Sequence, residues 1–568
     1  MFVVNEFLQE RFPSITKKPM LFKAIGGTLR YLLHESEFRN FGKKYPHLDG
    51  IDFVEQVLDY FDFSYQLSNR DRERVPVTGK VVIVANHPIG SLDGLALIQM
   101  VHQVRSDVKI LANDMLSSIK PLDKLLLPVN NMGGNTPKQN INRINNHLND
   151  GGAIILFPAG EVSRIKLSGV KDGRWSSGFL KIAKMAKAPI LPIYVKARNS
   201  AAFYVTSMVY KPLATLLLVK EMIKQSHKTV TIKVGNAIPF SSYRDVKLPQ
   251  KEVVKLFYKH LYRIGSNKSE VFETEVSIAH PENPCELHEH LNHHEIIGTT
   301  PDEKVIYLCK DINDSPILRE IGRLREISFR EVGEGSGLKR DTDQYDRYYY
   351  HLVLWDKVNL EIVGAYRFCD VKTVIENHGR KGLYTDTLFD FMQSMDSYFP
   401  QALELGRSFV QPKYWGKRSL DYLWFGIGAF IKKNPHFRYL FGPVSLSDQI
   451  PSKAKSLLIY FYQLYFGSSK AIARSKNPFM IDESVIDELK ETFTGDDYRG
   501  DFVQLKSMLS NMGVSIPTLY KQYTELCEDD GVKFLDFGID PAFSGCVDGL
   551  VLVDLIKLKD KKRSRYLS

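Results

Sequence analysis

The sequence of 568 residues has few cysteines and no hydrophobic run long enough to cross a membrane. Its five cysteines have no paired spacing: Cys285, Cys309, Cys369, Cys527 and Cys546. This scatter argues against a disulfide framework and favours a reducing compartment. The longest apolar stretches, 212–219 and 456–466, are well short of the roughly 20 residues that a spanning helix needs. We expect each stretch to be a core element or to lie on a membrane face.

We also expect neither a secretion signal nor nucleic-acid-binding motifs. The first residues, MFVVNEFLQERFPS, reach charged side chains too early for a signal peptide. Lys and Arg number 76 against 66 Asp and Glu, and this net charge of +10 favours anionic partners. No nucleic-acid motif accompanies the charge, so we expect an anionic membrane surface or an acidic carrier as partner, and no nucleic acid.

The length predicts two domains. Residues 1–75 have the spacing of amphipathic helices, and residues 75–245 alternate apolar strands such as KVVIVAN with helical segments such as GFLKIAKMAK. This alternation predicts an α/β fold with a mostly parallel sheet. A different α/β pattern occupies 304–568, and residues 266–303 contain few large apolar side chains and several breakers. The predicted domains are therefore 1–265 and 304–568, joined by a linker.

The expected linker carries a cluster of histidines: His288, His290, His293 and His294, with Cys285 nearby. Imidazole and thiolate groups are the usual zinc ligands, so the cluster has some metal-binding character. However, its spacing matches no standard zinc pattern. We predict a solvated connector and no metal site.

The stretch ANHPIGSLDGLA follows the apolar run KVVIVA, so His87 is expected at the carboxyl end of a buried strand. Ligands of α/β proteins bind at that edge of the sheet. Asp93 falls near the start of the next helix, where it can orient the imidazole. A histidine held in this way can take a proton from a hydroxyl that attacks an acyl thioester. Taken alone, the pattern also suits a histidine that only caps a turn.

Three blocks, NHPIGSLDG, ILFPAGEVSR and APILPIYV, follow one another in the N-terminal half. Together they resemble the glycerolipid acyltransferase superfamily, which contains the lysophosphatidate acyltransferases. The resemblance covers about residues 75–245. It implies that His87 and Asp93 are catalytic.

Two departures from that family's pattern bear on the acceptor. Five residues separate His87 from Asp93 where the family has four, and Ala159 stands where the family has Glu. The family's second block is thought to hold an acceptor phosphate, so the change argues against such an acceptor. Glu161 and Arg164 would suit the ammonium and carboxylate of a zwitterion, although a structural ion pair explains them too. This altered form resembles the O-acyltransferase half of bacterial amino-acid lipid synthases.

In the C-terminal half, the stretch ALELGRSFVQPKYWGKRSLDYLWFGIGAFI predicts a strand, a basic loop and a helix. The loop contains Gly416, Lys417 and Arg418, and Ser419 is placed to cap the helix. Backbone N–H groups at a helix start, reinforced by two cations, favour a pyrophosphate or a phosphopantetheine phosphate. A basic loop before a helix is common, however, and carries little weight in isolation.

The order of strands and helices from about 304 to 470 resembles the GNAT N-acyltransferase fold. Within it, ELGR and GLKRDTDQYD resemble the ornithine N-acyltransferases and the acyl-homoserine-lactone synthases. The resemblance implies an acyl donor carried on acyl carrier protein. It also implies an α-amino acid or a similar small amine as acceptor.

An attacking amine must lose a proton, so a carboxylate beside the donor loop can act as base. Glu404 is the candidate base, and Arg407 on the same strand is expected to hold either Glu404 or the acceptor carboxylate. Asp343 and Asp346 are expected to attract the acceptor's ammonium group, and Arg367 is a further candidate ligand. For each of these residues a structural salt bridge is the alternative.

These observations predict two acyltransferases fused on one chain. The resemblances imply that the C-terminal domain N-acylates an amino acid, ornithine or a similar one, with a 3-hydroxyacyl group from acyl-ACP, and that the N-terminal domain then esterifies the 3-hydroxyl. The donor, acyl-ACP or acyl-CoA, is a substrate, and no cofactor is expected. The basic segment KLKDKKRSR suits anionic lipid head groups, so we expect a cytoplasmic protein on the inner face of a bacterial membrane. The alternatives are a lysophosphatidate-type acyltransferase with an accessory GNAT domain and a non-catalytic scaffold.

Overall fold

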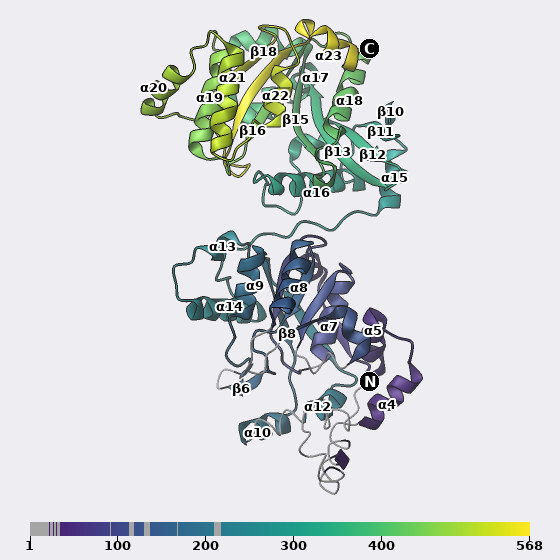
Figure 1. Ribbon diagram of the computed structural model, residues 1–568. Helices are drawn as coiled ribbons and strands as arrows, with labels where there is room; N and C mark the ends of the chain where they lie inside the picture. The colour runs from purple at the N-terminus through teal and green to yellow at the C-terminus, as the bar shows by residue number, and fades with distance from the viewer. Residues whose placement is uncertain are drawn as a thin grey trace. The chain divides into compact units, whose positions relative to one another are not determined.

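The computed structural model describes residues 22, 26–27, 30, 35–90, 92–112, 119–129, 137–166, 169–209 and 217–567. They belong to two compact units, Met1–Ser277 (unit 1) and Ile278–Ser568 (unit 2), each with its own sheet (Figure 1). Most of the helix expected before residue 35 and most of the apolar stretch 212–219 lie outside the described residues. Within the ranges given above, no helix is both long and apolar enough to cross a membrane.

Unit 1 is built on a seven-stranded sheet in the order β1-β9-β8-β2-β5-β3-β4. Its strands are β1 (Ser64–Gln66), β2 (Val81–Ala85), β3 (Val108–Ala112), β4 (Leu126–Pro128), β5 (Ala153–Leu156), β8 (Ile190–Lys196) and β9 (Thr229–Val234). Neighbouring strands are parallel except β8 and β9, so the predicted, mostly parallel sheet is confirmed.

Helices cover both faces of this sheet. On one face lie α5 (Gly50–Tyr60) and α7 (Leu92–His102), with Leu97 packed in the same core as Ile83. On the other face lie α8 (Lys138–Asn149), α9 (Gly178–Ala186) and α14 (Gln250–Gly265), with Phe179 in the core that contains Val84. Because β2 is buried at every residue, its sequence is continuously apolar and does not alternate.

The strand β1 lies inside the stretch expected to be helical. The helix α5 ends at Tyr60, and Asp62 adopts a left-handed φ of 46°, which a helix cannot continue through. The chain then pairs with β9, and Ser64 and Thr229 share a hydrogen bond of 2.8 Å between their hydroxyls. This pairing joins segments 165 residues apart, so local periodicity could not reveal it.

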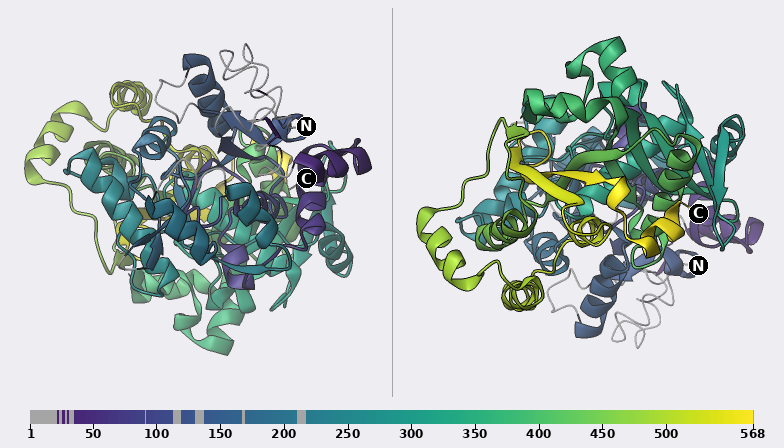
Figure 2. Two further views of the ribbon diagram at one scale, coloured as in Figure 1. Left: turned by 90° about the horizontal axis from the view of Figure 1, so that it is seen from below. Right: turned by 90° about the horizontal axis from the view of Figure 1, so that it is seen from above.

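Unit 2 has an eight-stranded sheet in the order β10-β11-β12-β13-β15-β16-β19-β18. Its strands are β10 (Glu295–Thr299), β11 (Val305–Cys309), β12 (Tyr350–Asp356), β13 (Glu361–Asp370), β15 (Ala402–Val410), β16 (Tyr439–Leu446), β18 (Val532–Asp540) and β19 (Cys546–Asp554). All neighbours are antiparallel except β15 and β16. The last two strands, yellow in Figure 2, form a hairpin whose turn contains Ser544 and Gly545.

Two groups of helices enclose the sheet of unit 2. The helices α16 (Pro316–Glu331) and α17 (Val371–His378) pack on one face. The helices α18 (Ser419–Lys433), α19 (Ser452–Phe466), α21 (Tyr498–Asn511) and α22 (Thr518–Thr524) share one core on the other face. The apolar stretch at 456–466 is thus a core helix, with Leu457, Leu458 and Phe461 fully buried.

The strands β15 and β16 are paired only at their beginnings. Residues 402–404 pair in parallel with residues 439–441, and the strands then continue with different partners. Beyond the pairing, β15 stays on β13 and β16 stays on β19. The two strands therefore separate and leave a wedge in the middle of the sheet, which we call the β15/β16 wedge.

Residues 278–303, expected to be part of a solvated linker, belong to unit 2. They contain α15 (Pro284–Leu291) and β10, the edge strand of the second sheet. Leu287 and Leu291 of α15 are buried against α16, so the few apolar residues of this segment are spaced to cover a core. An edge element buries only one of its sides, so it needs few apolar residues. This is why the segment has the composition of a connector although it belongs to a folded unit.

Candidate active sites

His87 lies directly after β2, in the loop that leads to α7. Its Nδ1 lies 3.2 Å from Oδ2 of Asp93, which is fully buried in the first turn of α7. The same carboxylate oxygen accepts hydrogen bonds from the backbone N–H groups of Ile89 and Gly90, at 3.0 and 3.4 Å. The backbone thus fixes Asp93, Asp93 faces Nδ1, and Nε2 is the nitrogen left for a substrate.

His87 and Asp93 each shift the pKa of the other in favour of its charged form. Burial lowers the pKa of His87, but the Asp93 carboxylate more than offsets this, and the pKa lies above its ordinary value. Burial raises the pKa of Asp93, while His87 and the two backbone N–H groups lower it by more, so the pKa is depressed. Asp93 is therefore ionised at neutral pH, and His87 is a stronger base than a histidine in water.

Two residues that sequence reasoning missed complete the surroundings of His87. Asp172 is buried, and its Oδ1 accepts hydrogen bonds from the backbone N–H of His87 at 3.3 Å and from the Ser163 hydroxyl at 2.5 Å. The ring of Phe157 stacks on the imidazole, with 4.0 Å between ring centroids. Asp172 is 85 residues from His87 in the chain, so no local pattern could have marked it.

Glu161 and Arg164 lie beside this site, because the N–H of Ser163 between them donates to the carbonyl of His87 at 2.8 Å. Nη2 of Arg164 is 3.6 Å from Oε2 of Glu161, so the ion pair considered above is present. Nε and Nη1 of Arg164 are buried without a hydrogen-bond partner among the described residues. The guanidinium therefore keeps donors that an anionic group of a substrate could use.

Glu404, the expected base in unit 2, is enclosed on the α17 face of β15. Its side chain is 1% exposed, and its Oε1 accepts a hydrogen bond of 2.6 Å from the N–H of Thr385. Its Oε2 accepts from the Tyr349 hydroxyl and from the N–H of Tyr384 at 3.3 Å. Burial raises the pKa of Glu404, although these donors oppose the change. The carboxylate fixes the loop at Tyr384, and both of its oxygens already have donors.

Asp346 and Arg367 form a buried ion-pair network that also includes Arg325. Both carboxylate oxygens of Asp346 accept from Arg325, at 3.0 and 2.9 Å, and Nη1 of Arg367 donates to Oδ1 of Asp346 at 2.9 Å. Burial would raise the pKa of Asp346, but the two guanidinium groups lower it well below its ordinary value. Asp346 is therefore part of a structural salt bridge, because Arg325 and Arg367 balance its negative charge inside the protein.

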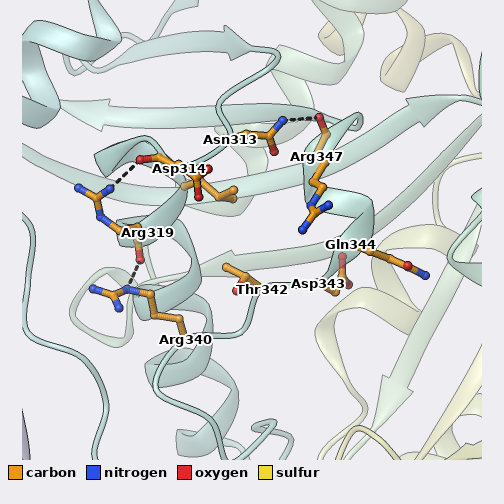
Figure 3. Close-up of a pocket in the computed structure, with 9 residues that line it drawn as sticks. Asn313, Asp314, Arg319, Arg340, Thr342, Asp343, Gln344 and Arg347 are labelled. Atoms are coloured by element: carbon orange, nitrogen blue, oxygen red, sulfur yellow. Dashed lines mark hydrogen bonds between the residues drawn. The ribbon is translucent and has the colours of Figure 1, made fainter. Parts of the chain in front are cut away.

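Asp343 is placed by the same network but faces a pocket. Its Oδ1 accepts from Nη1 of Arg367 at 2.5 Å and from the N–H groups of Tyr345 and Asp346. Its Oδ2 is buried without a hydrogen-bond partner in the described part of the chain. Figure 3 shows the pocket of about 670 Å³ that Asp343 lines together with Asn313, Asp314, Leu318, Arg319, Arg340, Thr342, Gln344 and Arg347.

Arg407 lies in a bulge of β15, next to the β15/β16 wedge. The register between β13 and β15 shifts between Arg367 and Ala365, and Arg407 adopts a φ of 49° there. Arg407 does not hold Glu404, which corrects one of the two expected contacts. Its Nε is instead 3.8 Å from Oδ2 of Asp341, and its guanidinium lies 5.0 Å from the Tyr384 ring centroid. Both oxygens of Glu404 already accept hydrogen bonds from Tyr349, Tyr384 and Thr385, so neither is left for Arg407.

The predicted donor loop precedes α18, as expected. Gly416 has a φ of 74°, and Lys417 and Arg418 are exposed beside the start of the helix. Ser419 does not cap α18: the N-cap residue is Arg418, and Ser419 is the buried first residue of the helix. The helix begins one residue earlier than a serine cap requires because Ser419 packs inward. The start of α18 and the two exposed cations before it remain suited to a phosphate.

The histidines at 288–294 lie on α15 and just after it. The His288 ring stacks against Trp355, with 6.0 Å between centroids. No group of three or more His, Cys, Asp or Glu side chains within the described ranges is arranged to hold a metal ion.

The basic segment at 557–565 is not a loose tail. It forms α23 (Asp560–Tyr566), which lies beside α18 in Figure 1. Arg565 and Tyr566 bind the carboxylate of Asp421 in the first turn of α18, the Tyr566 hydroxyl at 2.7 Å. Gly428 in the middle of α18 lets the backbone of Tyr566 approach closely, because a Cβ at this position would lie 1.9 Å from the Tyr566 carbonyl oxygen. The segment thus supports the donor-loop helix.

Comparison with known proteins supports both units. Residues 6–267 match the family described as acyltransferase, and residues 324–425 match the acetyltransferase (GNAT) domain. Glycine N(alpha)-acyltransferase of Bacteroides thetaiotaomicron is 30% identical over 283 residues, which cover 47% of this chain and 82% of the relative. Lyso-glycine lipid O-acyltransferase of the same bacterium is 31% identical over 258 residues, 43% of this chain and 94% of the relative. L-ornithine N(alpha)-acyltransferase of Agrobacterium fabrum is 33% identical over 118 residues, 20% of this chain and 39% of the relative.

Proposed function

Because this chain belongs to the family of aminolipid acyltransferases and joins an acyltransferase domain to a GNAT domain, we propose that it makes an amino-acid lipid in two successive acylations. Unit 2 N-acylates an α-amino acid with a 3-hydroxyacyl group. Unit 1 then esterifies the 3-hydroxyl of this lyso-lipid. The observation that carries the proposal is that one chain matches two relatives that are named for these two steps, each over more than four fifths of its length.

The geometry of unit 1 supports the second step. Nδ1 of His87 faces Asp93, so Nε2 takes the proton of the lyso-lipid hydroxyl. The alkoxide oxygen attacks the thioester carbonyl, the C–O bond forms, the C–S bond breaks, and the imidazolium returns the proton to the departing thiolate. Asp93 stabilises the imidazolium, and Arg164 offers its unpartnered nitrogens to the carboxylate of the amino-acid head group. Glu161 suits the ammonium group of a head group that has one.

The geometry of unit 2 supports the first step. We assign the thioester arm to the β15/β16 wedge, because β15 and β16 pair only at residues 402–404 and 439–441. The exposed loop with Lys417 and Arg418 lies at the start of α18, the helix that follows β15. We assign the phosphate of the phosphopantetheine arm to this loop, with Gly416 and the N–H group of Ser419 beside it. Acyl carrier protein is the proposed donor, and the anionic membrane surface is the proposed place of product release.

Two features favour an amino-acid acceptor over a phosphate acceptor. Ala159 leaves the second block without the Glu of the glycerolipid pattern, and two relatives that this chain covers over more than four fifths of their length are named for glycine and its lyso-lipid. The match to a protein named for ornithine is shorter. We therefore propose glycine as the first acceptor to test and ornithine as the second.

The proposal is tested with the purified full chain, acyl carrier protein loaded with a 3-hydroxyacyl group, and a panel of amino acids. The expected product is an N-(3-hydroxyacyl) amino acid, which becomes doubly acylated when acyl-ACP is in excess. Lysophosphatidate serves as the competing acceptor. A clear preference for lysophosphatidate would favour the phosphate-acceptor alternative, and no acyl transfer by a folded protein would favour the scaffold.

A further inference from the structure

We propose that the amino-acid acceptor of N-acylation binds at the β15/β16 wedge, where Arg407 holds its carboxylate and Asp548 takes the proton from its ammonium group. This inference rests on the proposed N-acylation and names the groups that perform it. It assigns the base to a strand that local sequence patterns did not single out.

Glu404 has no oxygen free for a substrate. The Tyr349 hydroxyl, the N–H groups of Tyr384 and Thr385, and the Cys369 thiol all point at its two oxygens. A carboxylate that accepts a proton from a substrate must present an oxygen to that substrate. Glu404 is therefore a positioning residue, which holds the backbone at Tyr384.

The strand register brings Asp548 to the opposite side of the wedge from Arg407. Ser445 of β16 pairs with Asp548 of β19, and the Ser445 hydroxyl donates to Oδ1 of Asp548 at 2.7 Å. No hydrogen bond from the described residues reaches Oδ2 of Asp548, although the residue is only 2% exposed. Arg407 stands on β15 beyond the point where this strand leaves β16. Asp548 and Arg407 lie close enough for their charges to interact, because Arg407 lowers the pKa of Asp548.

Two guanidinium groups with unused donors lie where we place the carboxylate of the acceptor. Arg367 and Arg407 lie 5.4 and 5.0 Å from the centroid of the Tyr384 ring. Nε of each, and Nη2 of Arg367, have no hydrogen-bond partner in the described part of the chain, and Arg367 is 1% exposed. Buried donors without partners are costly unless a ligand supplies the acceptors. A substrate carboxylate is such an acceptor.

Several acidic side chains lie where we place the ammonium group of the acceptor. Glu334 follows α16, and its loop is fixed by hydrogen bonds from Ser544 to Gly335 and from Ser447 to Val332, each 2.6 Å. Burial and the charge of Asp548 raise the pKa of Glu334 to about 7. Burial and the charge of Asp540 raise the pKa of Asp548 to about 7, although Arg407 opposes this. The titratable or charged groups around Asp548 are Glu334, Arg407, Asp540, Cys546, Tyr384 and Tyr520.

The proposed step balances without a cofactor. The Asp548 carboxylate takes one proton from the ammonium group of the acceptor, and the neutral amine attacks the thioester carbonyl. The C–N bond forms, the C–S bond breaks, and a second proton moves from nitrogen to the departing thiolate. Asp548 then releases its proton to water, so that each turnover gives one amide, one thiol and one proton.

The first test is the pH profile of kcat/KM for N-acylation by the full chain. Asp548 must be ionised to act, so the rate of the unchanged protein rises as the pH rises through about 7. Asp548→Asn keeps the acceptor for Ser445. We expect kcat/KM to fall on the order of 100-fold or more, and the rise of the rate through about pH 7, which we call the limb, to disappear. Asp540→Asn removes a neighbouring negative charge, so its limb moves to lower pH. Thermal unfolding checks that each variant is folded.

The second test compares an amino acid with the amine that lacks its carboxylate. The unchanged protein should prefer glycine to methylamine, and Arg407→Gln should lose most of this preference through a higher KM for glycine. A structural role would lower both rates equally. Asp548→Asn with the normal rate and limb, or Arg407→Gln with the normal preference, would overturn the inference. If the unchanged protein acylates no amino acid, the proposed function itself has failed.

Discussion

Asp93 acts on His87 through charge and through geometry. Its buried carboxylate is fixed by the backbone of the same loop, and it raises the pKa of the imidazole above its ordinary value. On the other side, the Phe157 ring covers the imidazole. Asp93 and Phe157 therefore orient the His87 ring and leave Nε2 for the proposed acceptor.

We expect Asp93→Asn to slow O-acylation by on the order of 10²- to 10⁴-fold, because the imidazolium loses its counter-charge and its fixed orientation. His87 acts when neutral, so O-acylation rises with pH through the raised pKa, and the substitution moves this limb to lower pH. The pH profile of kcat/KM with a synthetic lyso-lipid measures both effects. Asp107→Asn, an aspartate that pairs with Arg105, is the control. An unchanged limb in Asp93→Asn would contradict the assignment.

Asp346 is expected to stabilise unit 2 more than any surface ion pair. Asp346→Asn leaves the buried guanidiniums of Arg325 and Arg367 without their shared charge, which should cost about 3–5 kcal/mol of unfolding free energy. The folded-state pKa of Asp346 is depressed, so its contribution is present above the ordinary pKa of 3.8 and is lost as the pH falls below it.

Denaturant unfolding at pH 7 and at pH 3 measures this contribution. The variant should differ most from the unchanged protein at pH 7. Asp390→Asn removes an exposed charge and serves as the control. A loss below about 1 kcal/mol for Asp346→Asn, the level of a surface pair, would contradict the account.

At the scale of the elements, α23 packs against α18 and holds the start of this helix, which follows the proposed donor loop. Gly428 faces the backbone of Tyr566, and Asp421 at the start of α18 binds Arg565 and Tyr566. The final helix thus holds both the first turn and the middle of α18. The loop with Lys417 and Arg418 ends at this supported turn.

Gly428→Ala places a methyl group 1.9 Å from the Tyr566 carbonyl oxygen, so α23 must move or the fold must strain. We expect a loss of about 1–3 kcal/mol in unfolding free energy and faster proteolysis at the C-terminus. Gly298→Ala is the matched control, because its methyl group makes only ordinary contact, at 3.7 Å. Equal stability and equal proteolysis of the two variants would show that α23 is not held in this way.

What the sequence could predict depends on distance along the chain. His87 and Asp93 are six positions apart and joined by one loop, so their pairing could be read locally. Asp172 reaches His87 from 85 residues away, and Asp548 reaches the wedge through strand pairing with Ser445. Such contacts depend on sheet order, which local patterns do not encode. For the same reason the sequence could not show that Glu404 is enclosed, nor which arginines pair with Asp346.

At the scale of the whole molecule, two acyltransferase units share one chain. In the proposed reaction sequence the product of unit 2 is the acceptor of unit 1, and a tether would raise its effective concentration at the second site without any new contact. This organisation makes the two steps separable by mutation. A change at His87 should stop the second acylation and leave the first, because the two chemistries lie in different units.

The most direct test of this account is mass spectrometry of lipid extracts from a bacterial host that lacks amino-acid lipids. The host expresses either the unchanged chain or His87→Ala, and the amount of folded protein is compared. We predict a new, doubly acylated amino-acid lipid with the unchanged chain and its mono-acylated form with His87→Ala. A doubly acylated product in both strains, or no amino-acid lipid in either while the protein is folded, would contradict the account.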